Sequence, residues 1–539
     1  MGGVIGVLNT LKEIGIIVGE ASPSEFYFTS KPEDMPSRWE YVVVSSLEDV
    51  SGVLKEVTVI AQVQGVVSAS QALTKELDFD ISKKLVEAGI ADKKVWCKAR
   101  ILGYLTETGD VLQPRKAVTP GKPVYMAPQD VLEKFYSFSE DEGIHVGNLI
   151  TRSDIPVYLS LKGFRRHLAI IAQTGAGKSY LAGILADALL AKGATVIMLD
   201  PHADYVFLSR TSDGKRHELS DNIVVLRNPA STGRYSAEEV GKVEPYEVCF
   251  SDLDFDEVCL IARISPTYVN IRSGLEYAIS NLKENRKVFA PRDVLEELQR
   301  ADMWEVDEKV KSGARSAQKY IKRVIGMKVF TNVSTSIDRM LKPMQLSVVD
   351  LSGLEDEVSD YIAYKILSEI YDKAASGDFK YPIFIFVEEA HRFIPPDRKT
   401  YSSEVIRKIS AEGRKFGIFL ILITQRPSKI HPDALSQCNS QIIMRITNLE
   451  DQRAVSVSSE RMSRDLLDDL PGLNVGEAVI VGEMTRAPVM VKVKKRRTRE
   501  GGADIDIVGK LKEALAVGSE SKGEKEIQKL RDELKGIYS

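Results

Sequence analysis

The segment Gln173-Thr-Gly-Ala-Gly-Lys-Ser179 constrains the fold of this chain more than any other feature of its sequence. It follows an apolar run, His167–Ala172, and precedes a helical pattern with Leu181, Ile184 and Leu185 on one face. Glycines let such a loop curl so that several backbone N–H groups point at one anion, and the helix N-terminus adds positive partial charge. The segment therefore predicts a phosphate cradle between a strand and a helix of an α/β domain.

Two side chains of this loop are expected to reach a nucleoside triphosphate and its magnesium ion. We expect Lys178 to contact the β- and γ-phosphates and the Ser179 hydroxyl to bind Mg²⁺. The first position of the usual pattern, normally glycine, is Ala172, which is small enough to cost little at the end of a strand. The expected ATP-binding residues of the loop are Thr174, Gly175, Ala176, Gly177, Lys178, Ser179 and Tyr180.

A second apolar strand is predicted over Tyr381–Val387, and it ends in the adjacent carboxylates of Glu388 and Glu389. Hydrolysis needs more than a phosphate cradle, and two carboxylates at a strand end can divide that work. We expect Glu388 to hold Mg²⁺ through water, and Glu389 to orient and deprotonate the attacking water. Two solvated surface acids are the alternative, which an apolar strand leading directly into them disfavours.

Two more polar residues flank the next apolar run, Ile418–Thr424. Gln425 follows the run and could sense the γ-phosphate or position water, or it could simply cap a loop. Arg414 precedes the run in Ala411-Glu-Gly-Arg-Lys-Phe-Gly417. A cation supplied by a neighbouring subunit can neutralise charge on a transferring phosphoryl group, although from spacing alone a surface arginine is the simpler interpretation.

The pattern of apolar residues changes along the chain, and 539 residues at roughly 100–200 per domain allow two to four domains. Short apolar runs between turn clusters at the start predict a small β-barrel. Short apolar runs alternating with helical patterns then predict a mostly parallel sheet buried on both faces. The expected regions are the barrel at 1–130, the α/β core at 145–253 and 333–500, a helical insert at 254–332, and a helical tail at 501–539 with helices near Lys510–Leu515 and Glu524–Leu534.

Composition bears on compartment and partners. The net charge is −4 and the sequence pI is about 6.1, so any contact with nucleic acid must come from a local basic patch or a pore. The four cysteines fit neither a metal-ligand spacing nor a disulfide framework. No apolar run approaches the roughly 18 residues of a membrane helix, and the N-terminus lacks a signal-peptide pattern. We therefore expect a cytoplasmic protein without membrane association.

Taken together, the motifs resemble those of the HerA/FtsK group of hexameric DNA-pumping ATPases, and of the archaeal HerA type most closely. The resemblance covers nearly the whole chain, because the segment Val118-Thr-Pro-Gly-Lys-Pro-Val124 looks like part of the barrel that HerA shares with ATP synthase subunits. The other matching segments are Gln173–Ser179, Leu199-Asp-Pro-His-Ala-Asp-Tyr205, Phe386-Val-Glu-Glu-Ala-His391, Gly413-Arg-Lys-Phe-Gly417, Thr424-Gln-Arg-Pro-Ser428 and Gly476-Glu-Ala478.

This resemblance implies a RecA-like core in a homo-hexameric ring, with ATP between subunits and double-stranded DNA through the centre. It implies that Arg414 is an arginine finger acting in trans, that Gln425 is the sensor of the γ-phosphate, and that Arg166 is a further nucleotide contact. The strand before Gln425 is then expected between the P-loop strand and the strand before Glu388. A NurA-like nuclease partner, and a role in resecting DNA ends for recombination, are implied as well.

Three clusters have less specific patterns. Asp200-Pro-His-Ala-Asp204 holds three ligand-type residues, and a strand-end loop near the nucleotide or pore is favoured over a metal site. A second cluster falls on one helical face, where phosphate contact competes with a solvated face or a salt-bridge surface between subunits. A third follows the last predicted core strand, so it could face outward, toward DNA or a partner, and the sequence does not decide. The second cluster is Arg315, Lys319, Lys322 and Arg323, and the third is Lys494–Arg497 with Arg499.

Two alternatives to a DNA translocase remain open at this stage. A nucleotide-switched ring could clamp DNA and recruit a nuclease without moving, because a clamp and a pump need the same ATP site. A motor of the conjugation or secretion type is less favoured, since such motors often carry membrane segments and none is visible in this sequence. Ring size, six or seven, and the polarity of movement depend on geometry that the sequence does not show.

Overall fold

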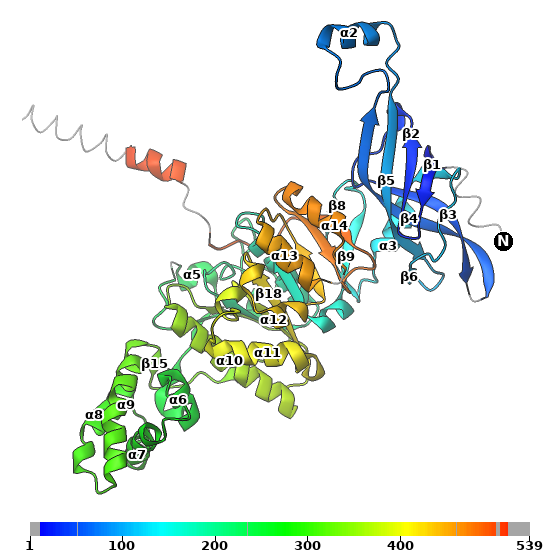
Figure 1. Cartoon of the computed structure of the whole chain (residues 1–539). Coiled ribbons are helices and arrows are strands. Elements are labelled where there is room, and N and C mark those ends of the chain that lie inside the picture. The colour runs from blue at the N-terminus through cyan, green and yellow to red at the C-terminus, as the bar shows by residue number, and fades with distance from the viewer. Residues whose placement is uncertain (1–10, 51, 234, 460, 503–506, 516–539) are drawn as a thin grey trace, which may run out of the picture.

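The computed structural model describes residues 11–502, except 51, 234 and 460, together with residues 507–515. A β-barrel lies at one end of the molecule, an α/β core in the middle and a helical insert at the other end (Figure 1). Within these residues no helix is both long and apolar enough to cross a bilayer. A helix covers 507–515, and the second predicted tail helix, near Glu524–Leu534, lies outside the described residues. The predicted fold class is confirmed.

The N-terminal barrel is closed by six antiparallel strands in the order β2-β1-β7-β3-β4-β5, with β5 pairing back onto β2. Its interior is filled by fully buried side chains such as Phe26, Phe28 and Val44. Helix α2 (Phe79–Glu87) projects from the barrel, away from the core (Figure 1). The strands are β1 (Glu13–Ala21), β2 (Glu25–Ser30), β3 (Tyr41–Val50), β4 (Val53–Ala69), β5 (Lys94–Leu105), β6 (Val111–Leu112) and β7 (Pro123–Met126).

The core contains one twelve-stranded sheet in the order β13-β12-β16-β11-β17-β18-β10-β19-β20-β21-β8-β9. The strands from β13 to β19 run parallel, and those beyond β19 are antiparallel. Every residue of the central strands β10, β11 and β17 is buried, which explains their continuous apolar runs. The bounds are β8 (Gly143–Leu149), β9 (Pro156–Ser160), β10 (Leu168–Ile171), β11 (Thr195–Asp200), β12 (Ile223–Arg227), β13 (Val243–Pro245), β16 (Leu346–Asp350), β17 (Ile383–Val387), β18 (Ile418–Thr424), β19 (Ser440–Ile443), β20 (Glu477–Val481) and β21 (Val489–Val493).

The strand order determines where the functional loops meet. Strand β18 lies between β10 and β17, as the family resemblance implied. Because parallel strands end at the same edge of a sheet, the loops after β10, β11, β17 and β18 gather at one edge. The helices of the core are α3 (Gln129–Tyr136), α4 (Lys178–Ala191), α5 (Ala237–Val240), α10 (Asp356–Ser376), α11 (Tyr401–Glu412), α12 (Pro432–Ser436), α13 (Leu449–Ser458) and α14 (Arg464–Asp469).

The helical insert carries the basic face that the sequence analysis singled out. Arg315 pairs at 2.8 Å with both Asp302 and Glu308, and Arg323 pairs with Glu357 on α10. Two of the four cations of this face thus form ion pairs within the chain, so they are already partly neutralised. The insert consists of α6 (Phe255–Ala262), α7 (Val269–Asn285), α8 (Pro291–Gln299) and α9 (Glu308–Gly326), between the short strands β14 (Val248–Cys249) and β15 (Phe330–Thr331).

Candidate active site

The loop after β10 has the backbone that a phosphate cradle requires. Gly175 and Gly177 have φ angles of 77° and 106°, a region that L side chains rarely adopt. The loop is held at both ends, because the Ala172 N–H donates to the Thr424 carbonyl and the Ala176 carbonyl accepts from the Gly476 N–H. Helix α4 begins directly at Lys178, so the first free N–H groups of that helix point into the loop.

Lys178 contacts the two predicted catalytic carboxylates. Its Nζ lies 3.0 Å from Oε1 of Glu389 and forms a second, shorter hydrogen bond with Glu388. Only 1% of the Glu388 side chain and 7% of the Glu389 side chain is exposed, so these are buried ion pairs. Burial raises the pKa of Glu388, while the same two carboxylates outweigh burial and raise the pKa of Lys178.

Glu389 has an unusual backbone. Its φ of 50° and ψ of 46° place a non-glycine residue in the left-handed region, which is uncommon and often found at functional sites. Burial works against ionisation of Glu389, but contact with His391 and with Lys178 outweighs it and lowers the pKa of Glu389 to about 2. Glu389 is therefore ionised over the physiological range, as a general base must be.

Gln425 reaches the phosphate cradle from the end of β18. Its Oε1 accepts a hydrogen bond of 2.5 Å from the Thr174 hydroxyl. Because β18 is the neighbour of both β10 and β17, its last residues lie between the loop and the paired acids. The structure thus brings five predicted site residues together: Thr174, Lys178, Glu388, Glu389 and Gln425.

The sequence placed the loop after β11 near the nucleotide or pore but assigned none of its residues a role at this site. The Ser179 hydroxyl donates to Oδ2 of Asp204 at 2.9 Å, and the Tyr205 hydroxyl donates to Glu388 at 2.5 Å. Asp200 holds this loop by accepting the backbone N–H groups of Asp204 and Tyr205, and its burial raises its pKa well above the ordinary value. The signal was the acid-rich motif itself, which composition alone could not distinguish from a structural turn.

A cleft of about 650 Å³ lies where the loops after β10, β11, β17 and β18 meet. The loop glycines form one wall, and Glu389, Gln425 and Asp204 contribute carboxylate and amide groups. A glycine-lined cleft with a lysine, an ionised acid and several oxygen ligands fits a polyphosphate with a divalent cation. The lining residues are Gln173, Thr174, Gly175, Gly177, Lys178, Ser179, Tyr180, His202, Asp204, Glu389, Gln425, Val475, Gly476 and Glu500.

The basic run after the last core strand does not face outward along its whole length. Arg496 is 5% exposed, and its guanidinium donates to the Ser179 carbonyl and to the Thr498 hydroxyl. Its backbone N–H donates to the Tyr180 hydroxyl at 2.6 Å. Gly183 leaves room for this side chain, because a Cβ there would lie 2.4 Å from Cζ of Arg496. Arg496 is therefore not available to DNA or a partner, and its buried charge is satisfied by hydrogen bonds beside the first turn of α4.

The two predicted arginines lie at the opposite edge of the sheet. Arg166 immediately precedes the segment that starts β10, and its guanidinium is 3.8 Å from Glu483. Arg414 is exposed and lies in a short 3-10 turn, Gly413–Phe416, just before β18 begins. Strands β10 and β18 both end at the edge where the cleft lies, and β10 leads there into the P-loop. Within one chain, the structure therefore does not bring Arg166 or Arg414 to the cleft.

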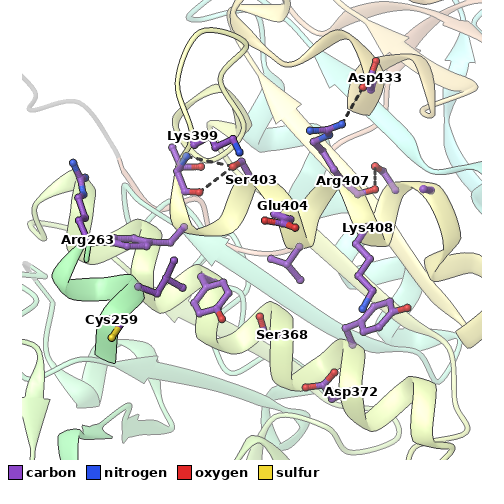
Figure 2. Close-up of a pocket in the computed structure, with 18 of the residues that line it drawn as sticks. Cys259, Arg263, Ser368, Asp372, Lys399, Ser403, Glu404, Arg407, Lys408 and Asp433 are labelled. Carbon is purple, nitrogen blue, oxygen red and sulfur yellow. Dashed lines mark hydrogen bonds and ion pairs between the residues drawn. The ribbon is translucent and has the colours of Figure 1, made fainter. Parts of the chain in front are cut away.

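A larger groove, of about 1280 Å³, lies away from the glycine loop between α6, α10 and α11 (Figure 2). It carries mixed charges, with Arg407 3.4 Å from Asp433 and Lys408 stacked 4.0 Å from the Tyr371 ring. Helix α11, which lines the groove as far as Ala411, ends two residues before Arg414. The groove has no glycine cradle, so it is not the nucleotide site.

The fold and the cleft together define a P-loop ATPase with a RecA-like core. Residues 144–370 match the family described as "Helicase HerA, central domain". The "DNA double-strand break repair helicase HerA" of Pyrococcus furiosus is 29% identical, over 92% of this chain and 96% of the relative. The protein of the same description from Saccharolobus solfataricus is 25% identical, over 93% of this chain and 95% of the relative. The chain is similar to the HerA helicases over most of its length, and it is an ATP-hydrolysing enzyme.

One solved structure with a similar fold is the bacterial conjugative coupling protein TrwB. It aligns with a TM-score of 0.49 and 13% sequence identity, over 69% of this chain and 93% of TrwB.

Proposed function

We propose that this chain is an ATP-driven motor that moves along double-stranded DNA as a six-membered ring and assists a NurA-like nuclease in processing DNA ends for recombinational repair. The observation that carries the proposal is the division of the expected ATP site between the two edges of one sheet. Lys178 and Glu389 are at one edge, and the exposed Arg414 is at the other. A second copy of the chain can complete this site, whereas one chain cannot.

Each residue of the cleft has a specific part in the proposed hydrolysis. Lys178 leaves its carboxylate partners to bind the β- and γ-phosphates, and Glu389 accepts a proton from the attacking water. Gln425, already bonded to Thr174, detects the γ-phosphate. Gly175, Ala176, Gly177 and Tyr180 form the rest of the nucleotide cradle.

Magnesium fits the oxygen ligands of the cleft. The Ser179 hydroxyl and the Glu388 carboxylate are the groups that would hold it, with Asp204 2.9 Å from Ser179. A bound Mg²⁺ ion would neutralise charge on the phosphate oxygens during transfer.

The ring proposal rests on Arg414 and its surroundings. The groove beside α11 is lined in part by tyrosine and arginine side chains, which are enriched at subunit interfaces, and α11 leads directly to Arg414. A neighbouring subunit seated on this face would receive Arg414 at its own cleft, where the guanidinium stabilises charge on the transferring phosphoryl group. Arg166, at the same edge, is proposed as a second trans contact.

The DNA proposal follows from the relatives. Several relatives that span more than nine-tenths of this chain are described as DNA double-strand break repair helicases. A shared motor and barrel over that length support the same substrate class here. A ring that clamps DNA without moving is the second candidate, because it needs the same cleft.

The proposal is tested with wild-type protein and Glu389→Gln, using linear duplex DNA. Wild-type turnover should rise with DNA, whereas Glu389→Gln should bind ATP normally and hydrolyse it at least about 100-fold more slowly. Displacement of a third DNA strand from a triplex separates a pump from a clamp, since only a pump strips the strand. Wild-type turnover that stays unchanged with saturating duplex DNA and nuclease would contradict the proposal.

A further inference from the structure

His391 links the two strand ends that carry the catalytic groups. Its Nδ1 lies 3.2 Å from Oε2 of Glu389, at the end of β17, and 3.2 Å from the hydroxyl of Thr424, the last residue of β18. Thr424 is fully buried and directly precedes Gln425, the residue bonded to Thr174. A continuous path of contacts thus joins the phosphate cradle to the catalytic acid through one imidazole.

The position of His391 is set by a rigid turn. The turn Ala390–Arg392 follows Glu389 directly, and the Arg392 N–H donates to the Glu389 carbonyl at 2.8 Å. The next two residues, Phe393 and Ile394, are buried at 1% and 0% exposure and anchor the turn in the core. The His391 ring is itself largely covered, with 18% of its side chain exposed. Such a ring keeps one orientation better than a solvent-exposed one.

The contact with Glu389 is close but leaves the carboxylate available. Oε2 of Glu389 is buried and accepts no well-aligned hydrogen bond from any described residue, although His391 Nδ1 is 3.2 Å away. The other oxygen, Oε1, is engaged by Lys178. The two contacts hold the carboxylate from opposite sides while Oε2 retains the capacity to accept a proton.

We propose that His391 is a positioning residue for hydrolysis, which holds the Glu389 carboxylate in line with the attacking water and ties that position to Thr424 and the sensor Gln425. The inference rests on the proposed role of Glu389 as the base. When the sensor strand end shifts on contact with the γ-phosphate, Thr424 moves the imidazole and the imidazole moves the carboxylate. His391 therefore couples recognition of the γ-phosphate to activation of water, although it is not among the residues that line the cleft.

The test compares His391→Ala with His391→Asn in the full-length protein, measuring nucleotide affinity and ATP turnover separately. Asparagine places an N–H near the position of Nδ1, so it should restore the contact. We expect His391→Ala to lower kcat roughly 100-fold, the effect of a misplaced catalytic group, with KM and ATPγS affinity unchanged. His391→Asn should recover most of that loss, and Asp213→Asn, a change at an exposed residue outside the cleft, should match the wild type.

Substitutions of Thr424 provide a second test of the inference. Thr424→Val removes the hydroxyl at nearly constant volume and should lower kcat, and Thr424→Ser should not. Combined with His391→Ala, Thr424→Val should add little, because both changes break one path. A normal kcat in His391→Ala would overturn the inference. It would also be overturned if His391→Ala lost both kcat and ATPγS affinity and His391→Asn restored neither.

Glu389→Gln distinguishes a failure of the proposed function from a failure of the inference about His391. If Glu389→Gln hydrolyses ATP normally, the proposed base is wrong. If Glu389→Gln is inactive while His391→Ala is fully active, only the role of His391 is wrong.

Discussion

Ser179 donates a hydrogen bond of 2.9 Å to Oδ2 of Asp204, so the hydroxyl expected to bind Mg²⁺ is oriented by a carboxylate from the loop after β11. Asp204 is fixed in turn, because its backbone N–H donates to the buried Asp200 at 3.0 Å. Groups that orient a metal ligand influence metal affinity nearly as strongly as the ligand itself. The loop after β11 is therefore part of the proposed magnesium site.

Asp204→Asn should weaken the response of the enzyme to magnesium. The amide is neutral and orients Ser179 less well, so the Mg²⁺ concentration for half-maximal ATP turnover should rise about tenfold or more. Titration of turnover with Mg²⁺ at saturating ATP measures this change. The exposed Asp213→Asn serves as the control, and equal Mg²⁺ curves for the two variants would show that Asp204 has no such role.

Lys178→Ala should abolish ATP turnover and also destabilise the protein. Its ammonium neutralises Glu388 and Glu389, which are buried, and removing one partner of a buried ion pair costs roughly 3 kcal/mol. Thermal unfolding should show a lower Tm for Lys178→Ala. The double variant Lys178→Ala with Glu388→Gln should recover part of that loss, because one unpaired charge is gone. A wild-type Tm for Lys178→Ala would contradict the buried pairing.

Much of the fold and half of the site could be predicted because their signals are local. The glycine loop, the paired acids at Glu388 and Glu389, and the apolar central strands are each readable within about ten residues. The contacts that complete the site join residues that lie far apart in the sequence. Arg496 meets Ser179 across 317 positions, and a cluster of cations in sequence normally indicates a solvated surface.

The same reason explains why His391 and Asp204 were not assigned roles in advance. Both lie inside motifs that were recognised, but their partners, Thr424 at the end of β18 and Ser179 in α4, come from other elements. Arg414 and Arg166 lie away from the cleft, so their roles depend on a second copy of the chain.

His167 should make the core sensitive to mild acid. The ring is 2% exposed, its Nδ1 accepts the Leu420 N–H, and its Nε2 lies 3.1 Å from the Ser410 carbonyl. Burial lowers the pKa of His167 to about 4, with the charge of Arg414 acting in the same direction. The unfolded chain takes up a proton below about pH 6.5, whereas the folded chain remains neutral until pH 4.

The stabilisation from neutral His167 is therefore complete above the unfolded pKa and declines as pH falls toward 4. At pH 5 the unfolded chain is 1.5 pH units below its own pKa. The free energy of unfolding should therefore be about 2 kcal/mol lower at pH 5 than at pH 7.5. Urea unfolding of the wild type and of His167→Gln at both pH values measures it. Glutamine cannot titrate, so the free energy of unfolding of His167→Gln should fall about 2 kcal/mol less than that of the wild type. Equal losses in the two proteins would show that His167 is not the group responsible.

The central claim is that two subunits build each ATP site, and mixing inactive variants tests it most directly. Arg414→Ala keeps the Lys178 cleft intact, and Glu389→Gln keeps Arg414 intact, so each variant alone should bind ATP without turnover. A mixed assembly contains interfaces in which an intact cleft meets an intact arginine. Our account predicts that the mixture regains ATP turnover that neither variant shows alone. Full turnover by Arg414→Ala alone, or a reassembled mixture as inactive as its parts, would contradict it.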